Sequence, residues 1–141
     1  MQRKGSAVWN GGLKDGKGAV STASGVLSNT QYSFATRFEN GAGTNPEELI
    51  AAAHAGCFSM ALSAQLGNAG LKPEKIETEA AVTLEKLESG FAITAVHLTV
   101  NATVPGASQE QFATAANSAK AGCPVSKVLN AKITMDAKLA G

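Results

Sequence analysis

The chain has 141 residues, of which 44% are hydrophobic and 16% charged, and its formal net charge is +1. A chain of this length can bury one ordinary core, so we expect a single domain over residues 1–141. Its Lys and Arg residues form no basic cluster, which argues against a nucleic-acid surface. We find no apolar run of signal-peptide length at the N-terminus and no stretch approaching the ~20 apolar residues of a membrane span. These features predict a cytoplasmic protein without a membrane partner.

Short strands separated by glycine turns are expected over residues 5–40. Tyr32, Phe34 and Phe38 alternate along the last of these strands and share one face. Arg37 is therefore expected on the opposite face.

A long helix is predicted from Asn45 to about Gly70. Asn45 is suited to cap it, Pro46 fits the first helical position, and Glu48 completes a reciprocal capping pattern. Apolar residues surround the helix, so we expect it to be covered on several sides.

The rest of the chain predicts a hairpin, two helices and a final strand, with no internal repeat or interdomain linker. The expected elements are, in order, strands over 76–84 and 96–104 joined by a turn at 88–90, a helix over 108–121, a short helix from Pro124, and a strand over 133–139.

The two cysteines, Cys57 and Cys123, are 66 residues apart, which excludes a CxxC motif and a zinc knuckle. Composition alone leaves two buried structural cysteines as an open alternative. Cys123 directly precedes Pro124 and so occupies a helix N-cap, where the helix dipole favours a thiolate. Cys57 lies in mid-helix and needs a cation from elsewhere to ionise.

Arg37 is the candidate for that cation, because arginine stays charged when buried and the other arginine, Arg3, is near the N-terminus. A guanidinium ~4 Å from the Cys57 sulfur would contribute on the order of 4 kcal/mol and lower its pKa. Glu47 can hold the guanidinium, yet about 15 Å of helical rise separates Glu47 from Cys57. We therefore hypothesise a dimer in which one chain supplies Arg37, with Glu47, to the Cys57 of the other.

The sequence also contains partial patterns for acyl transfer, phosphate binding and zinc binding. His54 shares a helix face with Cys57, as in a Cys-His pair for acyl transfer, but no third orienting group is evident. Residues 11–18 nearly spell a phosphate-binding loop, but glycine stands where serine or threonine is required. A zinc site built from the cysteines, His54 and His97 lacks ligand spacing, so we expect no metal.

Three segments of the chain resemble the OsmC/Ohr family of organic hydroperoxide reductases, and within it the OsmC branch. The segments are GTNPEELI at 43–50, HAGCFSMAL at 54–62 and KAGCPVS at 120–126. The resemblance covers nearly the whole chain. It implies an intertwined α+β homodimer, with antiparallel sheets packed on a long central helix that carries the peroxidatic cysteine.

The resemblance also implies roles for individual residues. Cys57 matches the peroxidatic cysteine and Cys123 the resolving cysteine. Arg37 matches the arginine that stabilises the thiolate, and Glu47 the carboxylate that holds it. His54 falls where the Ohr branch has tyrosine, so no role is carried over to it.

The activity implied is thiol-dependent reduction of alkyl or fatty-acid hydroperoxides, without a cofactor, through a Cys57 sulfenic acid and a Cys57–Cys123 disulfide. A dithiol reductant, in this family a lipoylated protein, would restore both thiols. An apolar substrate lining is expected from Leu49, Ile50, Phe58 and Met60. The alternative is a redox sensor or a hydrophobic-ligand-binding protein that uses the same dimer groove without turnover.

Overall fold

The structure is a computed structural model and describes residues 1–140. It contains two compact units, Met1–Leu49 and a second that begins at Ile50. Each unit is described by itself, and the single domain expected from the sequence stays a prediction. The elements are β1 (Gly5–Asn10), β2 (Lys17–Thr22), β3 (Thr30–Tyr32), α1 (Phe34–Phe38), α2 (Pro46–Asn68), β4 (Lys75–Leu87), β5 (Gly90–Thr103), α3 (Gln109–Gly122), α4 (Pro124–Val128) and β6 (Lys132–Leu139).

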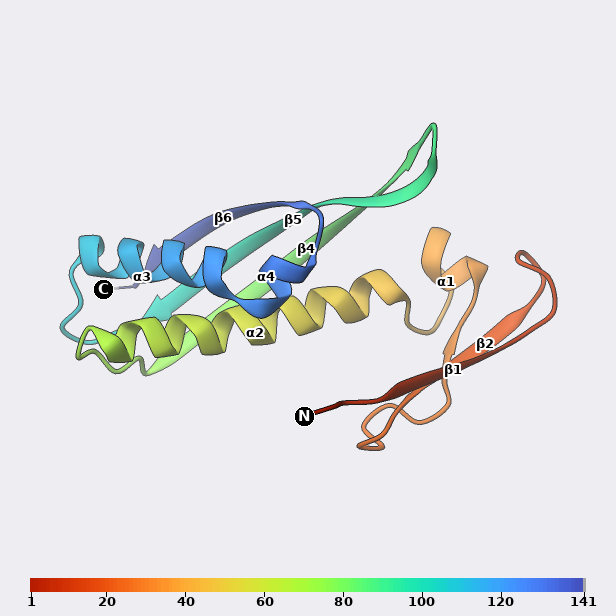
Figure 1. The fold of residues 1–141 in the computed structure, drawn as a ribbon, viewed down its shortest axis with the longest axis horizontal. Helices are drawn as coiled ribbons and strands as arrows, with labels where there is room; N and C mark the ends of the chain where they lie inside the picture. Colours follow the sequence, from red (N-terminus) through yellow and green to blue (C-terminus); the bar gives the residue numbers. More distant parts are fainter. Residues whose placement is uncertain (141) are drawn as a thin grey trace. The chain divides into compact units, whose positions relative to one another are not determined.

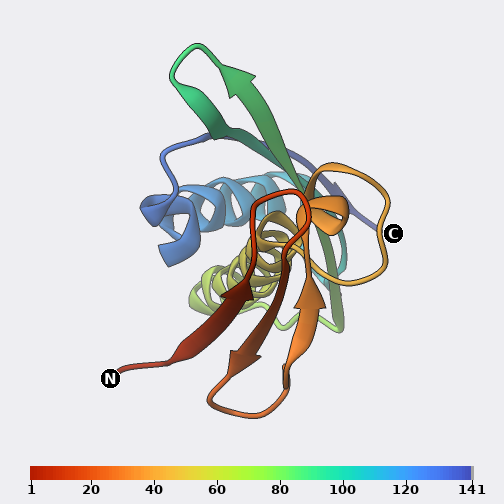
Figure 2. The same cartoon turned by 90° about the vertical axis from the view of Figure 1, so that its right-hand side faces the viewer.

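The first unit contains the antiparallel sheet β1-β2-β3, in which the three strands lie side by side (Figure 2). The rings of Trp9 and Tyr32 are 5.4 Å apart on this sheet. Gly18 pairs with both residues, and a side chain at that position would collide with both rings. Every residue of β1 is exposed, whereas β2 is partly buried along most of its length.

The last part of the first unit differs from the sequence prediction, because residues Phe34–Phe38 form helix α1 instead of continuing a strand. Ser33 caps the helix: its hydroxyl accepts from the backbone N–H of Thr36, and the Thr36 hydroxyl accepts from the N–H of Ser33. A spacing of four residues shares a face in a helix as well as in a strand, which is why the alternation was ambiguous. Phe34 and Phe38 do lie together, with ring centroids 4.8 Å apart.

Helix α2 begins and ends close to the predicted positions. The side-chain oxygen of Asn45 accepts from the backbone N–H of Glu48 at 2.8 Å, as expected of a cap. The Glu48 carboxylate accepts from the Thr44 hydroxyl at 2.8 Å, whereas the capping pattern predicted a bond to the Asn45 backbone. Gly70 follows the helix with a φ of +77°, a conformation that favours glycine at a helix end.

The expectation that α2 is covered on several sides is wrong within one chain. One face is fully buried and carries His54, Phe58, Leu62 and Leu66. The opposite face is exposed and carries small or apolar residues, namely Ala52, Gly56, Met60 and Ala64. Such a face is suited to packing against a further surface, because small side chains let another backbone approach closely.

Helix α2 is also long and apolar enough to cross a membrane, by length and composition only. This differs from the expectation that no stretch approaches that length. The finding carries little weight, because the core helix of a soluble protein passes the same test.

The second unit contains the sheet β4-β5-β6, with α2 and α3 on one of its faces (Figure 1). The β4–β5 hairpin was predicted, and in it Ile76 lies opposite Ala102 and Val82 opposite Val96. The pair β5–β6 is parallel, which corrects the expectation of antiparallel sheets; α3 and α4 supply the crossover that a parallel pair needs. The α+β class is confirmed. The fully buried core residues include Phe58, Leu62, Leu66, Val96, Leu98, Val100 and Ala116.

Candidate active site

The two cysteines meet inside the second unit. Cys57 lies on α2 and is half-buried, whereas Cys123 is buried between α3 and α4. Their Sγ atoms are 2.9 Å apart and share a hydrogen bond, and both thiols are free. Cys123 stands at the N-cap of α4 ahead of Pro124, as predicted. The fold thus brings together two sulfurs that the sequence separates by 66 residues.

The pKa values of the two thiols are shifted in opposite directions. Burial raises the pKa of Cys57, and the hydrogen bond with Cys123 raises it further. Burial alone would raise the pKa of Cys123 too, but hydrogen bonds from Cys57 and from the backbone and hydroxyl of Ser126 outweigh it and lower that pKa. Within one chain, the shared proton therefore favours Cys57. Cys57 is thus the less acidic of the two thiols in a single chain.

His54 extends this hydrogen-bonded group. It lies on the buried face of α2 with no exposed surface, and its Nε2 atom is 2.7 Å from the Ser126 hydroxyl on α4. Its Nδ1 atom is buried and has no hydrogen-bond partner among residues 1–140. Burial lowers the pKa of His54, which keeps the ring neutral. The Cys-His pair considered for acyl transfer is not seen, because the ring bonds Ser126 instead of Cys57.

In the first unit, Arg37 and Glu47 form the ion pair that the sequence predicted. The Nε and Nη2 atoms of Arg37 each lie 2.9 Å from the same oxygen, Oε1 of Glu47. The Glu47 carboxylate is almost fully buried, and its second oxygen, Oε2, has no hydrogen-bond partner among the described residues. The guanidinium also lies over the Phe38 ring at 5.3 Å. This pairing fixes the direction of the guanidinium fork.

An apolar pocket of about 290 Å³ lies beside this arginine and was not predicted from the sequence. It holds the chain's one tryptophan, its one tyrosine and two of its five phenylalanines. The lining residues are Trp9, Leu13, Tyr32, Ser33, Phe34, Arg37 and Phe38. In a chain with so few aromatic residues, their concentration between positions 9 and 38 was the signal that could have revealed this pocket.

The four residues expected to line the substrate site lie in different surroundings. Phe58 is fully buried in the core of the second unit. Met60 is 78% exposed, and Leu49 and Ile50 are half-buried. Among residues 1–140 of one chain, these four side chains therefore line no common pocket.

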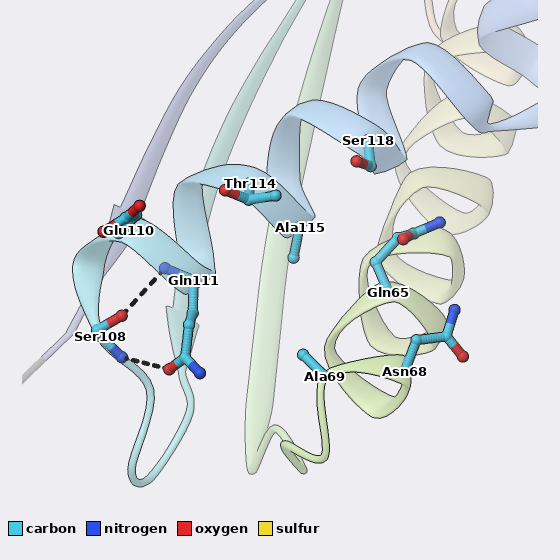
Figure 3. Close-up of a pocket in the computed structure, with 9 residues that line it drawn as sticks. All are labelled: Gln65, Asn68, Ala69, Ser108, Glu110, Gln111, Thr114, Ala115 and Ser118. Atoms are coloured by element: carbon cyan, nitrogen blue, oxygen red, sulfur yellow. Dashed lines mark hydrogen bonds between the residues drawn. The ribbon is translucent and has the colours of Figure 1, made fainter.

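Several polar side chains outside these two sites are engaged in helix caps or in hydrogen bonds on the surface of the sheet. A groove of about 380 Å³ is lined by residues near the end of α2 and along α3 (Figure 3). Its Ser108 and Gln111 side chains cap α3 and so are engaged with the backbone. His97 bonds Thr134 and Asp136 on the surface of the sheet. Among residues 1–140, no group of three His, Cys, Asp or Glu side chains could hold a metal ion.

Comparison with known proteins agrees with this site. A family model described as OsmC-like protein matches residues 39–138. The chain therefore belongs to the OsmC-like family.

Two relatives and one solved structure show how far this similarity extends. The chain is 55% identical over 139 residues to peroxiredoxin OsmC of Escherichia coli K12, covering 99% of this chain and 97% of that protein. It is 34% identical over 101 residues to an organic hydroperoxide resistance protein of Xanthomonas axonopodis pv. citri, covering 71% and 69%. The crystal structure of the organic hydroperoxide resistance protein OhrB of Bacillus subtilis superposes with a TM-score of 0.75 at 30% identity, covering 98% of each chain.

Proposed function

We propose that this protein is a thiol-dependent peroxidase that reduces organic hydroperoxides to alcohols. The observation that carries the proposal is the contact between the Sγ atoms of Cys57 and Cys123, 2.9 Å apart. The names of the relatives, a peroxiredoxin and an organic hydroperoxide resistance protein, support the same activity.

The proposed reaction has two steps within the protein. The Cys57 thiolate attacks the terminal oxygen of the hydroperoxide, the O–O bond breaks, and the alkoxide takes a proton and leaves as an alcohol. The sulfur of Cys123 then attacks the Cys57 sulfenic acid, an S–S bond forms, and the hydroxyl leaves as water. This disulfide protects Cys57 against further oxidation.

Arg37 supplies the positive charge that Cys57 lacks in a single chain. The raised pKa of Cys57 opposes ionisation of its thiol. A guanidinium near the sulfur would have two effects. It favours the thiolate, and it polarises the peroxide oxygen that receives negative charge in the transition state. Glu47 holds the guanidinium through Oε1 and so fixes its direction.

We propose a homodimer in which Arg37 of one chain serves Cys57 of the other. Ten residues of α2 separate Glu47 from Cys57, about 15 Å of helical rise, which is longer than an Arg37 side chain held by Glu47 can span. The exposed small-residue face of α2 and the fully exposed strand β1 leave apolar surface for a second chain to cover. Oε2 of Glu47, buried without a partner, can accept a further hydrogen bond in such an assembly.

The organic part of the substrate fits the aromatic pocket beside Arg37. Its apolar lining favours alkyl and aryl hydroperoxides over hydrogen peroxide, because burying an apolar group there contributes binding energy that hydrogen peroxide lacks. In the dimer, Leu49, Ile50 and Met60 of α2 are proposed to add apolar surface around the substrate, whereas Phe58, fully buried in the core, has none to offer. A ratio near one between the turnover of cumene hydroperoxide and that of hydrogen peroxide would argue against this preference.

An external dithiol completes the cycle, and we propose a lipoylated protein for this role. Cys57 is half-buried and Cys123 fully buried, so an incoming thiolate reaches the Cys57 sulfur. Cys123 then leaves as a thiolate, for which its lowered pKa suits it. A cytoplasmic location fits this cycle, because a disulfide there is transient and catalytic.

The test is the intact mass of the reduced protein after one equivalent of cumene hydroperoxide. We expect the loss of two hydrogens per chain, mapped by peptide digestion to a Cys57–Cys123 disulfide. With a dithiol present, many equivalents should be consumed per chain. Disulfide formation with a single turnover would instead identify a redox sensor, and an unchanged mass would exclude both functions.

A further inference from the structure

His54 is the fully buried polar residue that the proposed mechanism leaves without a role. Its Nε2 atom is 2.7 Å from the Ser126 hydroxyl. Ser126 is the third residue of α4, whose N-cap is Cys123, and its hydroxyl helps to lower the pKa of that thiol. Cys123 in turn contacts Cys57, with the two Sγ atoms 2.9 Å apart. All four residues lie in the second unit, on α2 and at the start of α4.

We propose that His54 is a positioning residue for Cys123: it donates from Nε2 to Ser126 Oγ and so turns the serine hydroxyl proton toward the Cys123 sulfur. His54 does not contact the reacting sulfur itself and acts only through Ser126. The meaning of this role for turnover rests on the proposed peroxidase function. The hydrogen-bond arrangement does not.

The choice of proton position on His54 follows from counting hydrogen bonds. A neutral ring carries one N–H, on either Nδ1 or Nε2. If Nδ1 carries it, the serine hydroxyl must donate to Nε2 and turns away from Cys123, and a buried N–H is left without an acceptor. If Nε2 carries it, the serine accepts from His54 and its own proton remains for Cys123. The second arrangement makes one more hydrogen bond in a buried region, where unmet donors are costly.

A fixed hydroxyl matters because Cys123 is a thiolate at two points of the cycle. It attacks the Cys57 sulfenic acid as a thiolate, breaking the S–O bond. It also leaves as a thiolate when an external dithiol attacks Cys57. A donor held on the sulfur stabilises the anion in both steps without reorganising. Among residues 1–140, Cys57 is the one titratable group that shifts the pKa of Cys123; Ser126 and Val125 act on it as neutral donors.

The first experiment measures the ultraviolet absorbance of the Cys123 thiolate as a function of pH, in a Cys57→Ala background of the full chain, where Cys123 is the one cysteine left. We expect Ser126→Ala and His54→Phe each to move the midpoint upward by about one pH unit, which is roughly a tenfold smaller thiolate fraction below the midpoint. His54→Gln, which retains a donor, and Ser126→Thr, which retains a hydroxyl, should restore most of the thiolate fraction.

His97→Gln is the matched control, because His97 bonds Thr134 and Asp136 on the sheet surface instead of the cysteine pair. It should leave the titration profile of Cys123 unchanged. If His54→Phe folds and keeps the parent profile, the positioning role is wrong, even where Ser126→Ala shifts it.

A second measurement needs no substitution and so does not depend on the variants folding. The ¹⁵N chemical shifts of the His54 ring in the reduced protein report which nitrogen carries the proton. We expect a neutral ring protonated on Nε2, and a ring protonated on Nδ1 would overturn the proposal. Neither measurement uses a hydroperoxide, so their failure leaves the peroxidase function standing. Loss of the disulfide in the mass experiment would remove that function alone.

Discussion

The two cysteines show how strongly local surroundings divide residues of one type. Both are in contact, yet Cys57 sits in mid-helix with a raised pKa, whereas Cys123 stands at a helix start with a lowered one. Backbone and hydroxyl donors at α4 lower the pKa of Cys123 despite its burial. Cys57 receives a backbone hydrogen bond from Val125, but burial outweighs it and the pKa of Cys57 is raised. The added cation that we propose for Cys57 would act against this rise.

This division of roles predicts different outcomes for the two serine variants. Cys57→Ser should abolish hydroperoxide consumption, because no nucleophile remains. Cys123→Ser should reduce one equivalent as Cys57 becomes the sulfenic acid and, under excess peroxide, a second as Cys57 becomes the sulfinic acid, after which consumption stops. Turnover in the presence of a dithiol, followed by intact mass, checks both. Sustained turnover by the Cys57→Ser variant would reverse the assignment.

His54 adds a pH dependence to stability. Its pKa is lowered by burial in the folded protein, so below about pH 6.5 the unfolded chain takes up a proton that the folded chain does not. The free energy of unfolding should therefore fall as the pH drops from about 6.5 toward the lowered pKa of the folded state. Chemical denaturation at about pH 7.5 and 5.5 measures this loss. His54→Gln should show a smaller difference between the two values, and an equal difference would mean that other groups cause it.

At the scale of elements, helices α1, α2 and α3 each begin at a residue whose side chain caps the helix. Helix α3 starts with a reciprocal cap between Ser108 and Gln111, and α1 with the corresponding pair Ser33 and Thr36. The start of α3 matters to the site because this helix delivers Cys123 at its other end.

Loss of the α3 cap should lower stability without changing chemistry. Ser108→Ala removes the hydroxyl that accepts from the Gln111 N–H, which costs about 1 kcal/mol. Urea denaturation measures the loss, and Ser108→Asp, which keeps an acceptor, should recover most of it. Peroxidase activity of the folded variant should match the parent. A change in activity larger than the change in folded fraction would contradict a purely structural role.

The aromatic pocket of the first unit predicts a specificity change. Trp9→Ala removes the largest wall of the pocket, and kcat/KM for cumene hydroperoxide should fall about tenfold, because apolar contact with the substrate is lost. The value for hydrogen peroxide should change little. Leu87→Ala is the matched control, since Leu87 is an exposed apolar residue of β4 in the second unit and does not line the pocket. Equal losses for both substrates would show that the pocket does not bind the organic group.

At the scale of the whole molecule, one chain leaves surfaces that ordinary globular proteins cover. The face of α2 opposite the core carries Met60 at 78% exposure among small residues, and Val8 of β1 is 61% exposed. An apolar helix face and an uncovered sheet are together typical of a chain that folds with a partner. A second copy is the partner we propose.

Mixing two inactive variants tests which chain completes the site. Arg37→Ala retains the cysteines, and Cys57→Ser retains the arginine. If the arginine acts across the dimer, a refolded mixture should recover up to about a quarter of the parent sites by random pairing. Each variant alone should stay near zero. A mixture that forms hybrid dimers but stays inactive would place both residues of a site in the same chain.

The sequence by itself determined most of the elements and the identity of the chemical groups. The hairpin β4–β5, helices α2, α3 and α4, and strand β6 were predicted because their periodicity, caps and glycines agree with one another. The Arg37–Glu47 pair was predicted because arginine is the one cation suited to the role. Helix α1 was missed because five residues fit two periods equally well, and the parallel β5–β6 pairing was missed because strand direction depends on the crossover path.

Only the tertiary structure decided what depends on distance. The 2.9 Å contact of Cys57 with Cys123, the Ser126 bond of His54 and the aromatic pocket at Arg37 each join residues from separate elements. A local pattern gives a residue its helix face or strand position but not its neighbours across the fold. The acidities of the two thiols follow from those neighbours, since desolvation and hydrogen bonding act over a few ångströms of space irrespective of position in the chain.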